Sequence, residues 1–127
     1  ITPAAGFVAP MGSFWIGIAG GFTGFFFAVY VKHWLGYDDS LDAFGVHGMC
    51  GIVGAILTAV FASPAVNELG TGASVSLQLF GIGVTIAWCA IATLVILMIV
   101  KLLIGLRVDE ATEIEGLDYR LHGESVH

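Results

Sequence analysis

Residues 42–58 read DAFGVHGMCGIVGAILT, an apolar run dotted with glycine that contains a single imidazole. Between Ala43 and Asn67 the chain has no Asp, Glu, Lys or Arg. At a rise of about 1.5 Å per residue, roughly 20 residues of α-helix cross the hydrocarbon core of a bilayer. We therefore predict a membrane-spanning helix over residues 43–62.

The imidazole of His47 gives this predicted helix a distinctive face. On an α-helix it shares its side with small residues, namely Ala43, Gly51, Gly54 and Thr58. An ionisable side chain in a membrane usually faces a bundle interior, a partner or a water-lined path. His47 is thus either a pore or proton-relay histidine, or a histidine that hydrogen-bonds to a neighbouring helix. The spacing alone leaves both interpretations open.

The composition indicates a membrane protein. The chain is 57% hydrophobic and 11% charged, with a mean hydropathy of +0.95, whereas soluble domains carry about 25% charged residues. The net charge of −6 argues against nucleic acid as a partner. Cys50 and Cys89 lie inside apolar runs without metal-ligand spacing, so we expect neither a disulfide framework, nor a metal site, nor a cofactor.

Two further charge-free runs predict membrane-spanning helices over residues 12–31 and 75–100, which makes 1–107 the transmembrane region and 108–127 a tail. The first run contains two interleaved Gly-x-x-x-Gly patterns, Gly17/Gly21 and Gly20/Gly24, which permit close helix packing. We predict that the 32–42 loop and the C-terminus lie inside and that the 63–74 loop lies outside. Every basic side chain is then inside, which satisfies the positive-inside rule. These basic residues are Lys32, Lys101, Arg107 and Arg120.

Aspartates precede the predicted 43–62 helix. Asp39 or Asp42 can accept backbone N–H bonds at its start and favour the positive end of its dipole. Alternatively, both form a vestibule that attracts cations. The two roles are compatible.

The tail is acidic, and its apolar residues recur about every three positions, at Val108, Ala111, Ile114 and Leu117. This pattern predicts a short amphipathic helix that ends at Gly116.

Several of these segments resemble one known family. DAFGVHGMCGIVG at 42–54 resembles the penultimate membrane helix of the ammonium transporter (Amt/Mep/Rh) family. GLRV at 105–108, EGLD at 115–118 and HGE at 122–124 resemble the tail of its Amt branch, and ITPA at 1–4 resembles the segment before the ninth helix. The resemblance covers about the last three transmembrane helices and the cytoplasmic tail. It implies an all-α membrane protein, part of an eleven-helix inverted-repeat fold that assembles as a homotrimer, so the chain is expected to be part of a larger whole.

The resemblance also implies functional roles. His47 matches the second of two hydrogen-bonded pore histidines, past which ammonium is thought to move after it has given up its proton. Ala43 and Gly51 would line the same pore, whereas the first histidine, the gate and the outer recognition site belong to family segments upstream. The tail would be regulatory and can meet a PII-type signal protein at the cytoplasmic face. The residues that match the regulatory tail of the family are Gly105, Arg107, Glu115, Gly116, Asp118, His122, Gly123 and Glu124.

The function we expect is therefore transport of ammonium or ammonia across the cell (plasma or inner) membrane by a multi-pass protein with a cytoplasmic C-terminus. The sequence offers no nucleophile–base pair, metal triad or phosphate-binding loop, so we do not expect an enzyme. The alternative is an Amt-derived regulatory or sensor module that acts through its cytoplasmic tail.

Overall fold

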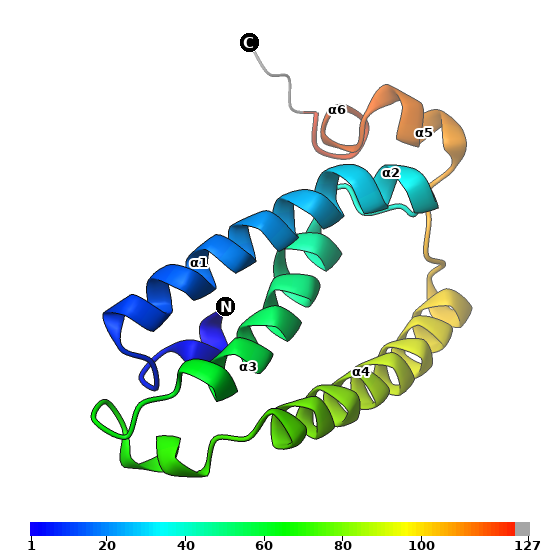
Figure 1. The fold of residues 1–127 in the computed structure, drawn as a ribbon. Coiled ribbons are helices and arrows are strands. Elements are labelled where there is room, and N and C mark those ends of the chain that lie inside the picture. Colours follow the sequence, from blue (N-terminus) through cyan, green and yellow to red (C-terminus); the bar gives the residue numbers. More distant parts are fainter. Residues whose placement is uncertain (124–127) are drawn as a thin grey trace. The chain divides into compact units, whose positions relative to one another are not determined.

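The computed structural model describes residues 1–123, and within them it is all-helical apart from loops and one isolated β-bridge (Figure 1). Three helices are long and apolar enough to cross a membrane: Pro10–Leu35, Phe44–Phe61 and Val75–Leu103. They confirm the all-α class and the three predicted spans. The chain divides into two compact units, residues 1–85 and 86–127.

The first span extends beyond the predicted residues 12–31 at both ends, from Pro10 to Leu35. It consists of α1 (Pro10–Phe25), the π-helical segment η2 (Phe26–Val31) and α2 (Lys32–Leu35). Pro10 occupies the first turn, where proline costs no hydrogen bond. Gly36 ends the span in the left-handed conformation, with φ of 63°.

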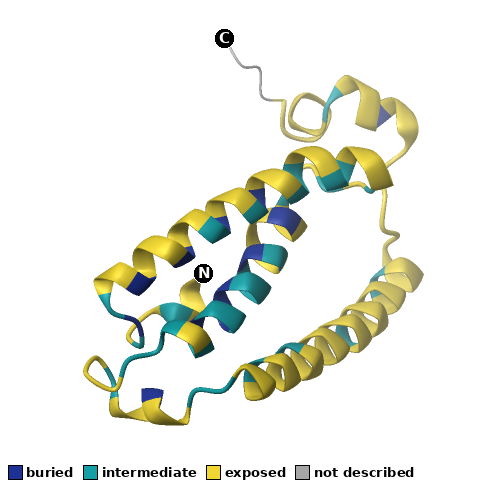
Figure 2. Ribbon diagram, in the orientation of Figure 1, coloured by how far each residue is buried: buried dark blue, intermediate teal, exposed yellow. Residues whose placement is uncertain are grey.

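The second span consists of the π-helical segment η3 (Phe44–Met49) and α3 (Cys50–Phe61). It runs antiparallel to α1, and the two helices contact each other along their length (Figure 1). Figure 2 shows the buried residues of both helices on the sides that face each other. The core between them is small and includes Ile16, Cys50 and Ala55, of which Ile16 is only 1% exposed.

Glycines decide how closely the two helices approach. Gly20 and Gly24 are buried, and a Cβ added at Gly24 would lie 3.1 Å from the Cys50 sulfur. In contrast, a Cβ at Gly17 or Gly21 would meet no atom within 4 Å. Only the second of the two predicted Gly-x-x-x-Gly pairs therefore lies at a helix contact in residues 1–123.

The N-terminal segment closes one end of unit 1. It contains the 3₁₀ turn η1 (Thr2–Ala4), packs against α3 and forms an antiparallel bridge between Val8 and Ala62. Gly54 leaves room for this segment because it has no side chain: a Cβ there would lie 2.7 Å from the Ile1 Cα. A loop with the 3₁₀ turn η4 (Glu68–Gly72) then leads to α4 (Val75–Leu103).

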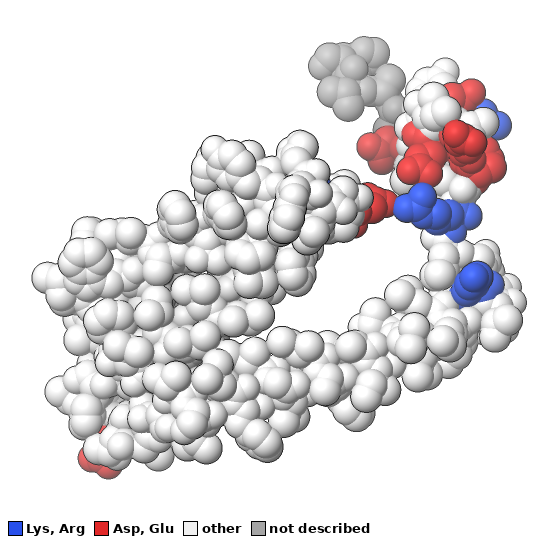
Figure 3. Space-filling view, turned by 45° about the vertical axis from the view of Figure 1, so that its right-hand side comes forward, with Lys and Arg blue, Asp and Glu red and all other residues white. Residues whose placement is uncertain are grey.

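Along α4, which crosses from the first unit into the second, no residue is buried (Figure 2). Charged side chains are concentrated in the tail, and the face drawn in Figure 3 is nearly free of them over the helical spans. The tail forms two short helices, α5 (Glu110–Glu115) and α6 (Leu117–His122), on either side of Gly116. The predicted end at Gly116 is confirmed, but the second helix was not predicted.

The apolar residues of the predicted amphipathic pattern in the tail are exposed within residues 108–123. Ile114 is 79% exposed and Leu117 is 46% exposed, whereas the buried residue of α5 is Thr112. A six-residue helix buries little surface by itself, so its apolar side chains need another surface to pack against.

Candidate functional site

The start of the second span is held by the carboxylate of Asp39. Its two oxygens accept hydrogen bonds from the backbone N–H groups of Ala43 and Phe44, both at 2.9 Å. These amides belong to the first helical turn, whose N–H groups have no hydrogen-bond acceptors within the helix. Asp39 therefore caps this helix.

Asp42 has a different structural role from Asp39. Its carboxylate pairs with the Lys32 ammonium at 2.7 Å, and the two side chains are 38% and 25% exposed. Asp42 also adopts a positive φ of 54°, and no other non-glycine residue within residues 1–123 has a positive φ. The ion pair thus connects the end of the first span to the start of the second, across the 36–43 loop.

Aromatic rings pack around the same turn. The ring of Phe44 meets Phe27 edge-on at 6.3 Å between centroids and Tyr37 edge-on at 5.7 Å. A shallow, open hollow of about 550 Å³ lies beside them. It is lined by Leu35, Tyr37, Asp38, Asp39, Ala43 and Phe44.

His47 lies in η3, one turn after this cap, and it is exposed. Ala43 is also exposed, and Gly51 is partly exposed, with no atom within 4 Å of a Cβ placed there. Gly54 and Thr58 are buried instead, and the Thr58 hydroxyl donates to the Gly54 carbonyl at 2.7 Å.

The residues of the predicted His47, Gly51, Gly54 and Thr58 face therefore differ in exposure, and the prediction that they share one face stays a prediction. That prediction assumed an α-helix throughout, but residues 44–49 are π-helical. A π-helical turn contains more residues than an α-helical turn, so it rotates the side chains before it relative to those after it. His47 also lies outside the contact that Gly54 makes with the N-terminal segment.

The tail residues singled out by the sequence are held by local contacts. Gly105 and Gly123 adopt positive φ after α4 and α6, at 83° and 65°, and Gly116 does so between α5 and α6, at 97°. Glu115 pairs with Arg120 across Gly116. Asp118 and His122 are exposed in α6, and Glu124 lies outside the described residues.

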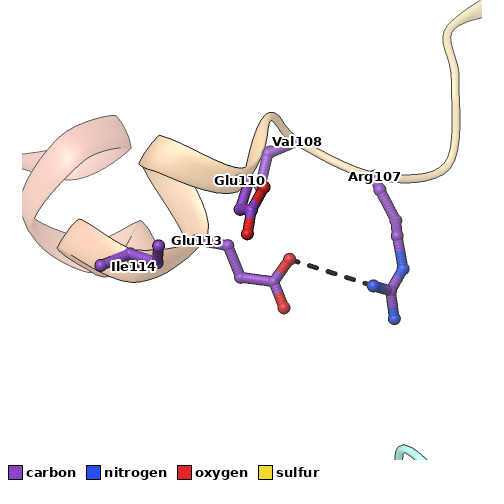
Figure 4. Close-up of a pocket in the computed structure, with 5 residues that line it drawn as sticks. All are labelled: Arg107, Val108, Glu110, Glu113 and Ile114. Atoms are coloured by element: carbon purple, nitrogen blue, oxygen red, sulfur yellow. Dashed lines mark ion pairs between the residues drawn. The ribbon is translucent and has the colours of Figure 1, made fainter.

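Arg107 lies beside α5 in an open pocket (Figure 4). Its guanidinium reaches the Glu113 carboxylate at 4.0 Å, and both side chains are mostly exposed. An exposed pair of this kind contributes little to stability. The pocket therefore offers one basic group among acidic ones on the tail.

Asp109 was not singled out by the sequence, yet it caps α5. Its carboxylate accepts hydrogen bonds from the backbone N–H and the hydroxyl of Thr112, both at 2.9 Å. These bonds favour the charged form, so the pKa of Asp109 lies below its usual value of 3.8. An aspartate immediately before a run of helix-forming residues is a cap signal that could have identified it.

Lys32 was also missed as a structural partner, because the sequence indicates only that it lies at an interface. Nothing in the pattern says that its ammonium reaches across the loop to Asp42. Among residues 1–123, no three His, Cys, Asp or Glu side chains are close enough to hold a metal ion.

Comparison with known proteins identifies the family. A sequence model described as "Ammonium Transporter Family" matches residues 1–127, the whole chain. The chain belongs to the ammonium transporter family. This confirms the resemblance that the 42–54 stretch and the tail motifs indicated.

Curated ammonium transporters match the chain over its full or nearly full length. An "Ammonium transporter" of Aquifex aeolicus is 48% identical over 132 residues, which cover 100% of the chain and 31% of that relative. An "Ammonium transporter" of Bacillus subtilis is 42% identical, with 100% of the chain and 33% of the relative covered. The "Putative ammonium transporter" of Methanothermobacter thermautotrophicus is 38% identical, with 98% and 33% covered. The chain therefore spans about a third of these family members.

Membership in this family and the three apolar helices together describe a membrane-embedded protein. They also agree with a chain that is not an enzyme.

Proposed function

We propose that this protein transports ammonium or ammonia across a membrane and that His47 lies in the pore. The observation that carries this proposal is an exposed imidazole one turn inside an otherwise uncharged spanning helix, in a chain matched along its whole length by the ammonium transporter family. An imidazole in this position needs a polar path or partner.

The physics of the substrate favours an uncharged step. An ammonium ion in a dry, apolar pore loses its hydration, and the effective penalty for such an ion is several kcal/mol. Deprotonation removes that penalty, because ammonia is neutral. A neutral imidazole offers one hydrogen-bond donor and one acceptor, so it can solvate ammonia without trapping a charge.

In this mechanism His47 is the second of a pair of pore histidines, and the first comes from sequence outside residues 1–127. Ala43 and Gly51 lie next to His47 on the same span and line the pore with small side chains. Asp39 and Asp42 lie at the cytoplasmic mouth, where their carboxylates attract cations in addition to the helix cap and the ion pair that they form.

The proposal extends to assembly and location. The protein is a homotrimer in the cell (plasma or inner) membrane, with residues 1–107 as the transmembrane region and 108–127 as a cytoplasmic tail. The tail is regulatory and meets a PII-type signal protein at the cytoplasmic face. The basic residues at 32, 101, 107 and 120 support this orientation through the positive-inside rule.

Transport is tested in proteoliposomes that contain the purified protein in the length in which it occurs naturally. A pH-sensitive dye inside the vesicles and a current measurement across them are followed after an ammonium pulse. Entry of ammonia alone raises the internal pH faster than in protein-free vesicles, whereas entry of ammonia with a proton, or of ammonium, produces current. Correctly inserted protein that produces neither signal would contradict the proposal.

A further inference from the structure

Two π-helical segments contact each other in unit 1, and His47 lies in one of them. They are η2 (Phe26–Val31) and η3 (Phe44–Met49). A π-helical turn is rare and is found mostly as a short interruption of an α-helix. Two such turns in contact indicate that something specific in their packing stabilises this geometry.

Gly45 makes the closest of these contacts. A Cβ at this position would lie 2.9 Å from the Ala28 backbone nitrogen, and 3.3 Å from both the Ala28 Cα and the Phe27 carbonyl carbon. These are backbone atoms, so they cannot rotate away as the end of a side chain can. Any side chain at position 45 would push η3 away from η2.

Other bonds fix the two ends of η3. Asp39 accepts the N–H groups of Ala43 and Phe44 at its start. After its end, the Cys50 thiol donates to the Gly45 carbonyl at 3.5 Å and to the Gly20 carbonyl of α1 at 3.2 Å. The segment is therefore held at its start, at Gly45 and at its end.

This arrangement sets the direction of His47. His47 is exposed, and the π-helical turn, which contains more residues than an α-helical turn, rotates it relative to the residues of α3. We infer that Gly45 is a positioning residue for His47: its lack of a side chain lets η3 pack as a π-helix against the backbone of η2. Asp39 assists by fixing where η3 begins. The inference rests on the proposed function only for the effect on transport.

The test compares Gly45→Ala with Gly48→Ala in the complete protein. Gly48 is a matched control from the same segment, because a Cβ there would meet only the Phe44 ring, at an ordinary contact distance of 3.4 Å. The nitrogen NMR shifts of the His47 imidazole, assigned by their loss in His47→Ala, report its surroundings directly. We expect Gly45→Ala to move these shifts and to lower ammonium flux several-fold, and Gly48→Ala to move them much less.

Unchanged His47 shifts in folded Gly45→Ala, or equal shifts in the two variants, would overturn the inference. If Gly45→Ala does not fold, Asp39→Asn replaces it, because the amide retains only one acceptor oxygen for the two backbone N–H groups. Its His47 shifts are expected to move, and unchanged shifts in that variant reject the inference. Since the NMR signal does not depend on transport, a wild-type protein without flux rejects the proposed function alone.

Discussion

Asp42 combines an ion pair with a backbone conformation that side chains rarely adopt. Its φ of 54° lies in the left-handed region, where a Cβ approaches the following carbonyl oxygen. Its carboxylate meanwhile reaches Lys32 at 2.7 Å. The residue thus brings a local backbone cost that the ion pair offsets.

Removal of the side chain at this position separates the two effects. Asp42→Ala loses the ion pair and keeps the left-handed penalty, whereas Asp42→Gly loses both. We expect the glycine variant to be more stable than the alanine variant by about 1 kcal/mol, measured by thermal unfolding in detergent.

Ser40, two residues earlier in the same loop, is the control position for this comparison. It does not have positive φ, so alanine is expected to be at least as favourable as glycine there. An Asp42→Ala protein as stable as Asp42→Gly would show that the left-handed backbone carries no cost.

The sequence predicted part of this detail and missed the rest. It placed a cap at Asp39 or Asp42, because an aspartate before an apolar run is a helix-start signal. Which of the two accepts the amides depends on the path of the 36–43 loop, and the Lys32 pair helps to set that path. Lys32 in α2 and Asp42 lie on either side of a loop, so no helical or strand periodicity relates them and the pair cannot be inferred from the sequence.

At the scale of elements, the three spans could be predicted because long charge-free runs and their flanking Pro, Gly and charged residues are strong local signals. The π-helical segments could not be predicted, because the same apolar pattern suits an α-helix. Their geometry depends on the approach of Gly45 to the Ala28 backbone, which is a tertiary contact.

The cap of α5 predicts a response of the tail to acid. The pKa of Asp109 is lower in the folded tail than its usual 3.8, so its bonds to Thr112 stabilise α5 fully above that value. The stabilisation that the charged carboxylate adds is lost as the pH falls through the lowered pKa. We expect the Thr112 amide to exchange several-fold faster with solvent in acid than near neutrality, beyond the intrinsic effect of pH, as measured by hydrogen exchange.

Asp109→Asn supplies the matched control for this response. An asparagine oxygen still accepts the Thr112 N–H but does not titrate, so the acid-dependent change is expected to disappear. Protection of Thr112 that falls equally in both proteins would show that another group controls α5.

At the scale of the whole molecule, the chain contributes His47 within an uncharged span and a large apolar surface. Along α4, Trp88 and Leu102 are 72% and 85% exposed, and the helix has no buried residue. Because the chain spans 31% of the Aquifex relative, no pattern within it could test the first histidine or the outer recognition site that the family resemblance implies. The family could be identified from the sequence, whereas the full pore could not.

We propose that the C-terminal tail, residues 108–127, regulates transport by the whole protein. Deletion of residues 108–127 is expected to weaken flux or its regulation without preventing membrane insertion, since the spans end before it. Flux in proteoliposomes and the amount of protein in the membrane fraction measure the two effects. Replacement of the same residues by a Gly/Ser chain of equal length separates the role of their sequence from that of chain length.

If the deletion variant or the Gly/Ser variant retains the flux and regulation of the wild type, the sequence of residues 108–127 has no regulatory role.

The measurement that tests the central claim most directly is ammonium flux and current in proteoliposomes of the wild type, His47→Ala and His33→Ala. His33 is the control, because it is exposed at the end of the first span and its ring nitrogen pairs with the Val29 carbonyl of its own helix. We predict that His47→Ala folds normally and changes the rate, or the charge carried per ammonium, whereas His33→Ala transports as the wild type does. A folded His47→Ala protein with unchanged flux and current would remove His47 from the pore.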